Sequence, residues 1–294
     1  LYCNFLSSQV DLSTKIWMCP FCLQRNPLPP HYREISAGNV PAELMQDFTT
    51  IEYGLPRGAN IPPIFFFVVD TCLVEEDMKA LREALTVSLS LLPPRSMVGL
   101  ITFGTMVQVH ELGFADVPKS YVFRGSKDYT QTQIQEMLGL TPGSVPQQQQ
   151  QQPGQSQSAG SGAFRFVMPL EQCEFTLGQI FEQLQRDPWP VDSDKRPERS
   201  TGVATSIALS LLEAQFPACA ARVMVFCGGA CTVGPGMIVG KELRESIRSH
   251  HEIDADSAKY FKKASTFYEG LAKRAAANGH IVDLLVGCLD QVGL

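Results

Sequence analysis

Apolar runs alternate with amphipathic segments over most of the chain. Continuous apolar, β-branched or aromatic runs predict buried strands at 64–69, 97–103, 107–112, 164–168, 222–226 and 281–289. Apolar residues at helical spacing predict helices over 71–93, 130–138, 176–184, 201–216 and 254–277. Asp254 is the expected N-cap of the last helix, and Asn278-Gly279 its stop. Because strands and helices alternate, we expect an α/β fold with a mostly parallel sheet covered by helices on both faces.

Three segments depart from this pattern and suggest how the chain is divided. Residues 1–35 are too few to bury a core of their own, and 36–60 have the mixed, proline-bearing composition of a connecting segment. Residues 141–162 are rich in Pro, Gly, Ser and Gln, a composition that cannot bury a core, so we predict a disordered surface loop there. The main domain is expected at 61–294. The chain begins with Leu1 and ends directly after an apolar run, so we expect a fragment whose last domain is cut at its C-terminal end.

Composition and charge exclude several classes of protein. With 44% apolar residues among 294, the chain can build a sizeable core. Thirty acidic residues against 24 basic ones give a formal charge of −6, which argues against a dedicated nucleic-acid binder. No apolar run approaches the ~20 residues that span a bilayer. Nine cysteines, several of them inside apolar runs, indicate a reducing compartment.

Cys19 and Cys22 form a Cys-x-x-Cys pair. Two thiolates at this spacing can hold one Zn²⁺ from a tight turn, but a tetrahedral site needs a second pair, and only Cys3 and His31 lie near in the sequence. A redox pair would normally stand at a strand-to-helix junction, whereas a polar, proline-bearing stretch follows here. We therefore favour half of a zinc knuckle, with ordinary loop cysteines and a redox pair as the alternatives.

Asp70 ends the first predicted strand, at the edge where open α/β sheets bind ligands. A von Willebrand A-type domain places D-x-S-x-S there, and carboxylate and hydroxyl oxygens are the ligands that Mg²⁺ prefers. In this chain Cys72 and Val74 replace the serines, Gly228 follows the later strand where an aspartate would stand, and Thr201 is the remaining hydroxyl. We predict a structural remnant of such a site and no working metal centre.

The other chemistry-bearing patterns are weaker. The glycine-rich stretches 228–229 and 234–236 match neither G-x-x-x-x-G-K-[ST] nor G-x-G-x-x-G, the two patterns of phosphate-binding loops. The nucleophile pattern G-x-S-x-G does not occur in the sequence. We find no catalytic constellation and expect no enzyme activity. Basic residues crowd the last predicted helix and most simply form a solvated face, with an anionic membrane surface as the alternative. They are Lys259, Lys262, Lys263, Lys273 and Arg274.

Several long stretches together resemble one known family. They include IWMCPFC at 16–22, SLLPP at 90–94, KSYVFRG at 119–125, QRDPWP at 185–190 and GPGM at 234–237. These stretches, with others between them, are similar to the Sec23 family, the inner-layer subunits of the COPII vesicle coat. The similarity covers nearly all residues from about 16 to 294, except the Gln-rich loop.

The resemblance implies part of a zinc finger at 1–35 and a von Willebrand A-like trunk domain at 61–294. Cys19 and Cys22 match the second cysteine pair of the family's finger, whose first pair would precede Leu1, and Cys3 matches a cysteine that is not a ligand. A structural role in endoplasmic reticulum to Golgi vesicle transport follows. The implied partners are a Sec24-type sister subunit, a Sar-type small GTPase and outer coat subunits, with no nucleic acid among them.

The resemblance also implies a cytoplasmic protein that lies peripherally on endoplasmic reticulum exit sites and COPII vesicles. Full-length members activate the GTPase with an arginine from a downstream gelsolin-like domain, which is not among these residues. The alternative function is that of a metal-dependent adhesion-type A domain, which would bind a protein ligand through Mg²⁺ at Asp70.

Overall fold

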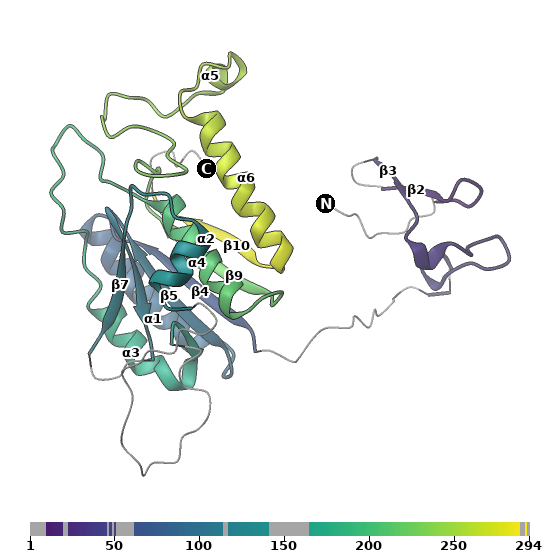
Figure 1. The fold of residues 1–294 in the computed structure, drawn as a ribbon, viewed down its shortest axis with the longest axis horizontal. Coiled ribbons are helices and arrows are strands. Elements are labelled where there is room, and N and C mark those ends of the chain that lie inside the picture. The colour runs from purple at the N-terminus through teal and green to yellow at the C-terminus, as the bar shows by residue number, and fades with distance from the viewer. Residues whose placement is uncertain are drawn as a thin grey trace, which may run out of the picture. The chain divides into compact units, whose positions relative to one another are not determined.

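In the computed structural model, the described residues are 10–19, 23–45, 47–48, 50, 62–113, 117–140, 165–288 and 292. They belong to two compact units, residues 1–60 and residues 61–294 (Figure 1). The segment 141–162, for which we predict a disordered loop, lies outside the described residues.

The smaller unit contains a short antiparallel sheet. Its strands are β1 (Val10–Asp11), β2 (Ile16–Met18) and β3 (Arg25–Pro27), in the order β1-β2-β3, and two 3-10 turns follow at Pro30–Tyr32 and Ala42–Leu44. Trp17, Cys19 and Ile35 are its buried hydrophobic residues within the described part. So few buried side chains make a small core, which is typical of units that a bound metal or a partner stabilises.

The larger unit is built on one sheet of seven strands. They are β4 (Ile64–Asp70), β5 (Met97–Phe103), β6 (Met106–Glu111), β7 (Lys119–Arg124), β8 (Val167–Pro169), β9 (Ala221–Cys227) and β10 (Ile281–Val286). The order is β10-β9-β4-β5-β6-β7, and β8 pairs with β5. The centre, β10 to β5, is parallel, and β6, β7 and β8 join it antiparallel. A strand that helices cover on both faces buries the side chains of both faces, so its sequence is a nearly continuous apolar run, as in β4.

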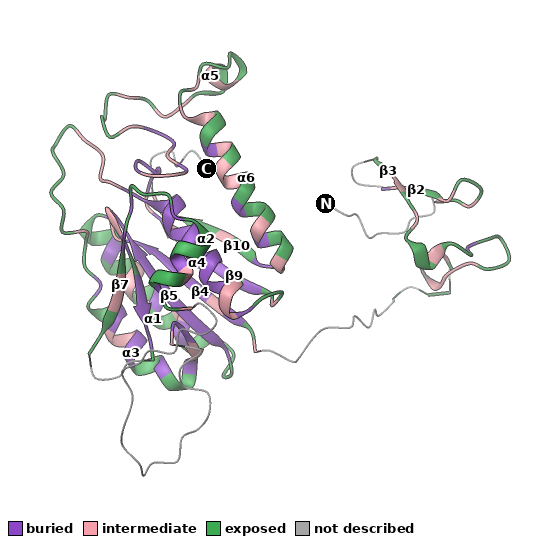
Figure 2. Ribbon diagram, viewed as in Figure 1, coloured by how far each residue is buried: buried purple, intermediate pink, exposed green. Residues whose placement is uncertain are grey.

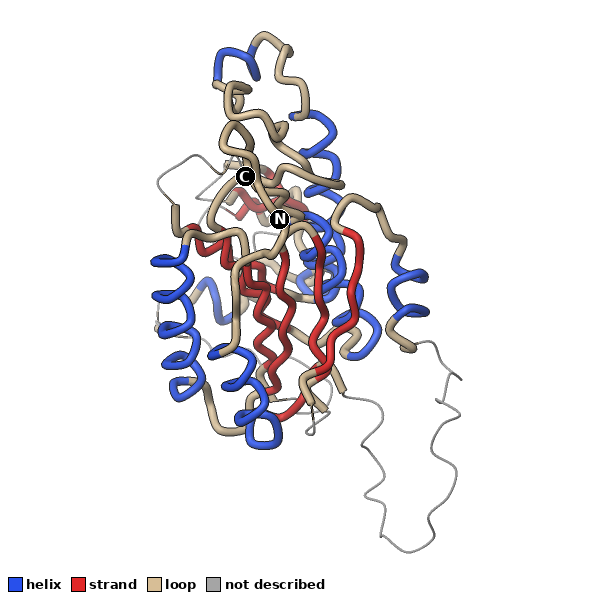
Figure 3. Tube along the Cα trace, turned by 90° about the vertical axis from the view of Figure 1, so that its left-hand side faces the viewer, coloured by secondary structure: helices blue, strands red, loops and turns tan. Residues whose placement is uncertain are grey.

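Helices lie on both faces of this sheet (Figure 3). They are α1 (Glu75–Leu91), α2 (Gln131–Met137), α3 (Leu170–Glu182), α4 (Thr201–Gln215), α5 (His250–Asp254) and α6 (Phe261–Asn278). Side chains of α1 and α3 form one core with alternate residues of β4 and β5, such as Phe67 and Leu100. Side chains of α4, α2 and α6 form the other core with residues that include Phe66 and Val107. The buried residues accordingly concentrate in the central strands and α4 (Figure 2).

The predicted fold class is confirmed, while several elements differ from expectation. The helix expected at 176–184 is α3, which begins already at Leu170, and strands β1 to β3 were not predicted. Strand β7 was not predicted, because its sequence KSYVFR alternates only weakly between apolar and polar residues.

Asp254 is not the cap of the long helix, so that prediction is wrong. A capping box between Ser249 and Glu252 starts a separate helix, α5, which ends at Asp254. Asp256 has a left-handed φ of 55°, so the helical conformation is interrupted before α6 begins at Phe261.

The last long helix ends as the sequence predicts. Gly279 has φ 72°, and its N–H bonds to the carbonyls of Ala275 and Ala276. Among the described residues, none of the helices combines the length and apolarity that a bilayer span requires.

Candidate functional site

The carboxyl end of the parallel sheet holds a fully buried carboxylate, that of Asp70. Its exposed fraction is 0%. The backbone N–H of Cys72 donates to Oδ1 over 2.7 Å, and the N–H of Gly228 donates to Oδ2 over 2.8 Å. Asp70 ends β4 and Gly228 follows β9, so these bonds join the ends of two parallel strands at the edge where such sheets bind ligands.

A guanidinium supplies the positive charge that this carboxylate needs. Nε of Arg199 lies 2.6 Å from Oδ2 of Asp70, and Arg199 is only 4% exposed. Its Nη2 donates to the carbonyl of Cys72 over 3.1 Å. Burial is the largest single influence on the pKa of Arg199 and lowers it. The charge and hydrogen bond of Asp70, together with the neighbouring Cys72 and Cys227, nevertheless raise the pKa overall, so the side chain stays cationic. A Cβ on Gly229 would lie 2.4 Å from Nη1 of Arg199, so a larger residue there would displace the guanidinium from its present position.

This arrangement explains why the Mg²⁺ motif is degenerate. Burying a carboxylate with neither a cation nor hydrogen bonds costs much free energy, and in an A-type domain a bound Mg²⁺ supplies the compensating positive charge. In this chain the cation is Arg199. The Thr201 hydroxyl, the other candidate Mg²⁺ ligand in the sequence, lies 3.9 Å from the sulfur of Cys227. Sequence reasoning missed Arg199, because its only signal is a basic residue two positions before a predicted helix.

Asp187 anchors a loop beside this cluster. Its Oδ2 accepts the N–H of Thr105 over 2.6 Å and lies 3.7 Å from the thiol of Cys72. Its own N–H donates to the carbonyl of Thr71 over 2.9 Å. The loop that carries Trp189 is therefore fastened to the ends of β4 and β5.

The thiols of this cluster are not activated. Burial, followed by the negative charge of Asp70, raises the pKa of Cys72 well above its ordinary value. The same two causes raise the pKa of Cys227 to about 11. Both side chains are therefore protonated thiols at neutral pH, and their environment does not favour the reactive thiolate.

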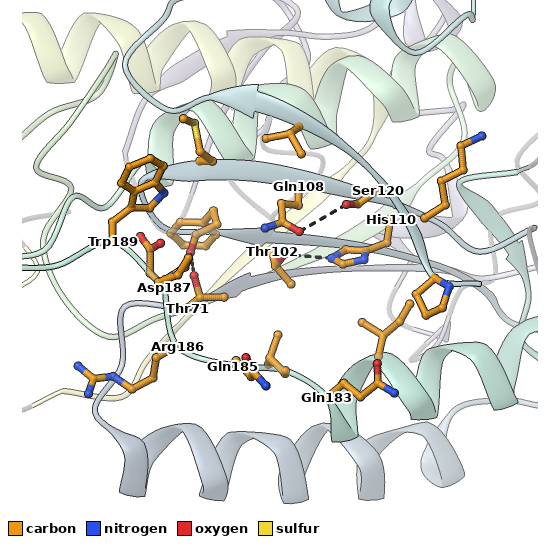
Figure 4. A pocket seen from close by; sticks show the side chains of 18 residues that line it. Thr71, Thr102, Gln108, His110, Ser120, Gln183, Gln185, Arg186, Asp187 and Trp189 are labelled. Carbon is orange, nitrogen blue, oxygen red and sulfur yellow. Dashed lines mark hydrogen bonds between the residues drawn. The ribbon is translucent and has the colours of Figure 1, made fainter.

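A polar cavity of about 440 Å³ opens next to Asp187 (Figure 4). In Figure 4, Trp189 and Asp187 lie at one end of the cavity, and His110 and Gln183 lie at the other. Nε2 of His110 lies 3.0 Å from the hydroxyl of Thr102. Burial lowers the pKa of His110 to about 4, so the ring is neutral at physiological pH.

The predicted zinc ligands are only partly described. Cys19 is buried in the smaller unit, and its carbonyl accepts the N–H of Leu23 over 2.9 Å. A buried thiol is compatible with a zinc ligand. Cys22 lies outside the described residues, and among those that are described no group of three or more His, Cys, Asp or Glu side chains is arranged to hold a metal ion.

Three of the five basic residues near α6 have acidic partners within the protein. Lys262 lies 2.5 Å from Asp256, and Lys259 lies 3.6 Å from Glu245. Arg274 contacts the carboxylate of Glu213 at 2.7 Å. These pairs weaken the alternative of an anionic membrane surface and favour the solvated face.

Comparison with known proteins agrees with this geometry. The Sec23/Sec24 trunk domain matches residues 60–294, and the Sec23/Sec24 zinc finger matches residues 2–32. The crystal structure of the human COPII-coat protein Sec24c is similar with a TM-score of 0.52 at 17% identity, a likeness that shows the fold. The match covers 99% of this chain and 36% of that one, so the chain spans little more than a third of the human protein's length. Since the trunk match extends over most of its residues, the chain belongs to the Sec23/Sec24 family.

Proposed function

We propose that this chain is part of an inner-layer COPII coat subunit of the Sec23 type and serves as a structural component in transport from the endoplasmic reticulum to the Golgi. The observation that carries the structural, non-catalytic part of the proposal is the Asp70–Arg199 pair. It places a guanidinium where a related fold would bind Mg²⁺, so the carboxylate at the end of β4 has a cationic partner without a metal. Such an arrangement suits assembly better than catalysis.

The proposed partners are a Sec24-type sister subunit, a Sar-type small GTPase and outer coat subunits, with peripheral contact to the endoplasmic reticulum membrane. This makes the protein cytoplasmic and bound to exit sites and COPII vesicles. The Sec23 assignment, as opposed to Sec24, rests on the sequence stretches quoted above.

The chain is proposed to bind the GTPase without stimulating it. Arginine fingers accelerate GTP hydrolysis by compensating phosphate charge, and in this family the finger belongs to a domain outside these residues. Arg199 cannot take that role, because its guanidinium is buried against Asp70.

Zinc is the proposed cofactor of the smaller unit, with Cys19 and Cys22 as two of its four ligands. In this proposal residues 1–35 form part of a zinc finger, 36–60 a connecting segment and 61–294 the trunk domain. Zinc would stabilise a unit whose own core is small.

The test is co-purification with a Sec24-type subunit, followed by mass determination by light scattering. A one-to-one complex is expected, and a folded chain that forms no complex would contradict the proposal. GTP turnover by a Sar-type GTPase is the second measurement, and clear stimulation by this chain would overturn the non-catalytic role. The alternative adhesion-type domain predicts instead a protein ligand whose binding is lost with EDTA.

A further inference from the structure

On the face of the large sheet that α1 and α3 cover, the part formed by β6 and β7 has no hydrophobic core of described residues over it. The residues of β6 and β7 that face the α1 and α3 side are mostly polar: Gln108 pairs in register with Val122, and His110 with Ser120. None of these four side chains belongs to a hydrophobic core cluster, and all four line the cavity. In contrast, β4 and β5 present Phe67 and similar residues to the helices on that same side. This half of the face is therefore built to meet solvent or a ligand.

Two large apolar side chains are left exposed at this cavity. Val122 is 56% exposed and Trp189 is 52% exposed. The loop that carries Trp189 is fastened by Asp187, so the indole is presented from a fixed backbone. Exposed apolar side chains among convergent polar groups are characteristic of binding sites.

The charges at the cavity favour an acidic ligand, although the whole chain has a net charge of −6. Its lining contains two cations, Lys119 and Arg186, and one carboxylate, Asp187. Lys119 already pairs with Glu111 at 2.9 Å, so within the lining we assign the attraction for an acidic ligand to Arg186. Asp187 is already engaged by the N–H of Thr105. Arg124, at the end of β7, follows Ser120 and Val122 at alternate positions on the same strand face.

The edge of β7 provides the backbone for recognition. β7 is the last strand in the sheet order and, among the described strands, it pairs only with β6. At its C-terminal end the N–H of Arg124 donates to the hydroxyl of Tyr129 over 2.9 Å, so the pairing edge is the part of β7 before Arg124. An edge strand has a row of unpaired N–H and C=O groups that an extended segment can join. The alternate side chains of an added strand would then point toward the cavity.

We propose that the free edge of β7 and the cavity beside it bind an extended acidic segment of a partner protein. The segment adds a strand to β7, places an apolar side chain between Val122 and Trp189, and turns its carboxylates toward Arg124 and Arg186. A concave site with a strand edge fits a peptide better than a flat membrane surface. The proposal does not depend on the coat assignment.

The test uses Trp189 fluorescence of the whole chain and a synthetic peptide of about eight residues, close to the length of a common strand, that alternates glutamate with valine. Trp17 is the other tryptophan and is buried in the smaller unit, so Trp189 is the indole open to quenching. The expected result is saturable binding that the corresponding lysine-valine peptide does not show. A copy of the glutamate peptide that is N-methylated at alternate residues cannot form the strand pairing and is expected not to bind.

Charge-reversal variants locate the site. The double variant Arg124→Glu and Arg186→Glu is expected to weaken binding about tenfold, since each side chain is exposed and contributes a modest pair energy. Lys263→Glu with Lys273→Glu on α6 makes the same change of net charge elsewhere and is expected to leave binding unchanged.

Three results would overturn the proposal. They are failure of the glutamate peptide to bind the folded chain, equal binding of its lysine or N-methylated counterpart, and equal loss in both double variants. Vesicles of phosphatidylserine and phosphatidylcholine provide a further comparison. If they bind and lose affinity only with the Arg124 and Arg186 changes while the peptide does not bind, the site is a membrane surface and not a peptide site.

Discussion

The two polar sites at the carboxyl end of the sheet differ in what satisfies their buried groups. Between β4 and β9, the Asp70 carboxylate is met on all sides by Arg199 and two backbone N–H groups. Beside β6 and β7, His110 and Gln108 face a cavity of about 440 Å³. At the first site a guanidinium occupies the position beside the carboxylate, whereas at the second a cavity opens. A degenerate metal motif can therefore mark a position that a side-chain cation has taken over, and the open space lies next to it.

The sites are physically connected. Cys72 lies between them: its N–H bonds to Asp70, and its sulfur lies 3.7 Å from Asp187. The Asp70–Arg199 pair thereby supports the cavity, because it holds the end of β4, to which Asp187 fastens the Trp189 loop. Four predictions test this difference, from the largest expected effect to the smallest.

Arg199→Ala should destabilise the larger unit most. It leaves the Asp70 carboxylate buried without a cation, and removing one partner of such a pair costs ~3–5 kcal/mol. Urea denaturation measures the change in the free energy of unfolding. Arg222→Gln is the matched control, because its pair with Asp283 is exposed and solvent-screened and should contribute little to stability. Equal small effects in the two variants would contradict the role we assign to Arg199.

His110 should make stability depend on pH. Its pKa falls from 6.5 to about 4 on folding, so protons bind preferentially to the unfolded chain below pH 6.5. The contribution of the neutral ring is complete above pH 6.5 and is lost as the pH falls toward 4, by about 3 kcal/mol in total. The measurement is the free energy of unfolding against pH for the wild type and His110→Gln. Parallel curves over this range would show that His110 is not the group responsible.

Asp187→Ala should have an intermediate effect on stability, since it leaves the half-buried N–H of Thr105 without its acceptor, at a cost near the lower end of ~1–3 kcal/mol. It should also loosen the Trp189 loop, which fluorescence anisotropy of the indole reports. If stability fell while the anisotropy stayed unchanged, Asp187 would support the fold without positioning Trp189.

Mg²⁺ should have the smallest effect. Because Arg199 already occupies the position beside Asp70, millimolar Mg²⁺ should leave the melting temperature of the wild type unchanged. The double variant Cys72→Ser and Val74→Ser restores the serines of the motif and is expected to stay insensitive, since the guanidinium remains. A rise in melting temperature with Mg²⁺ in either protein would show that Arg199 does not replace the metal.

Most of the large fold follows from local pattern. The run Ile64–Asp70 is a buried strand in the structure, as its apolar residues predict, and Gly279 ends the last long helix in the left-handed conformation that a C-terminal glycine allows. The weakness of the Mg²⁺ motif was also visible in Cys72 and Val74. These features depend on residue type and on spacings of a few positions, and both can be read directly from the sequence.

The sequence by itself thus determined the α/β class, the family resemblance and the absence of the motif serines. Only the tertiary structure decided what replaced the metal, because Asp70 and Arg199 are 129 positions apart and meet through strand pairing and helix packing. The same holds for the cavity, whose lining joins β5, β6 and β7 to the end of α3 and the Trp189 loop. Long-range packing brings such groups together, and no periodicity along the chain records it.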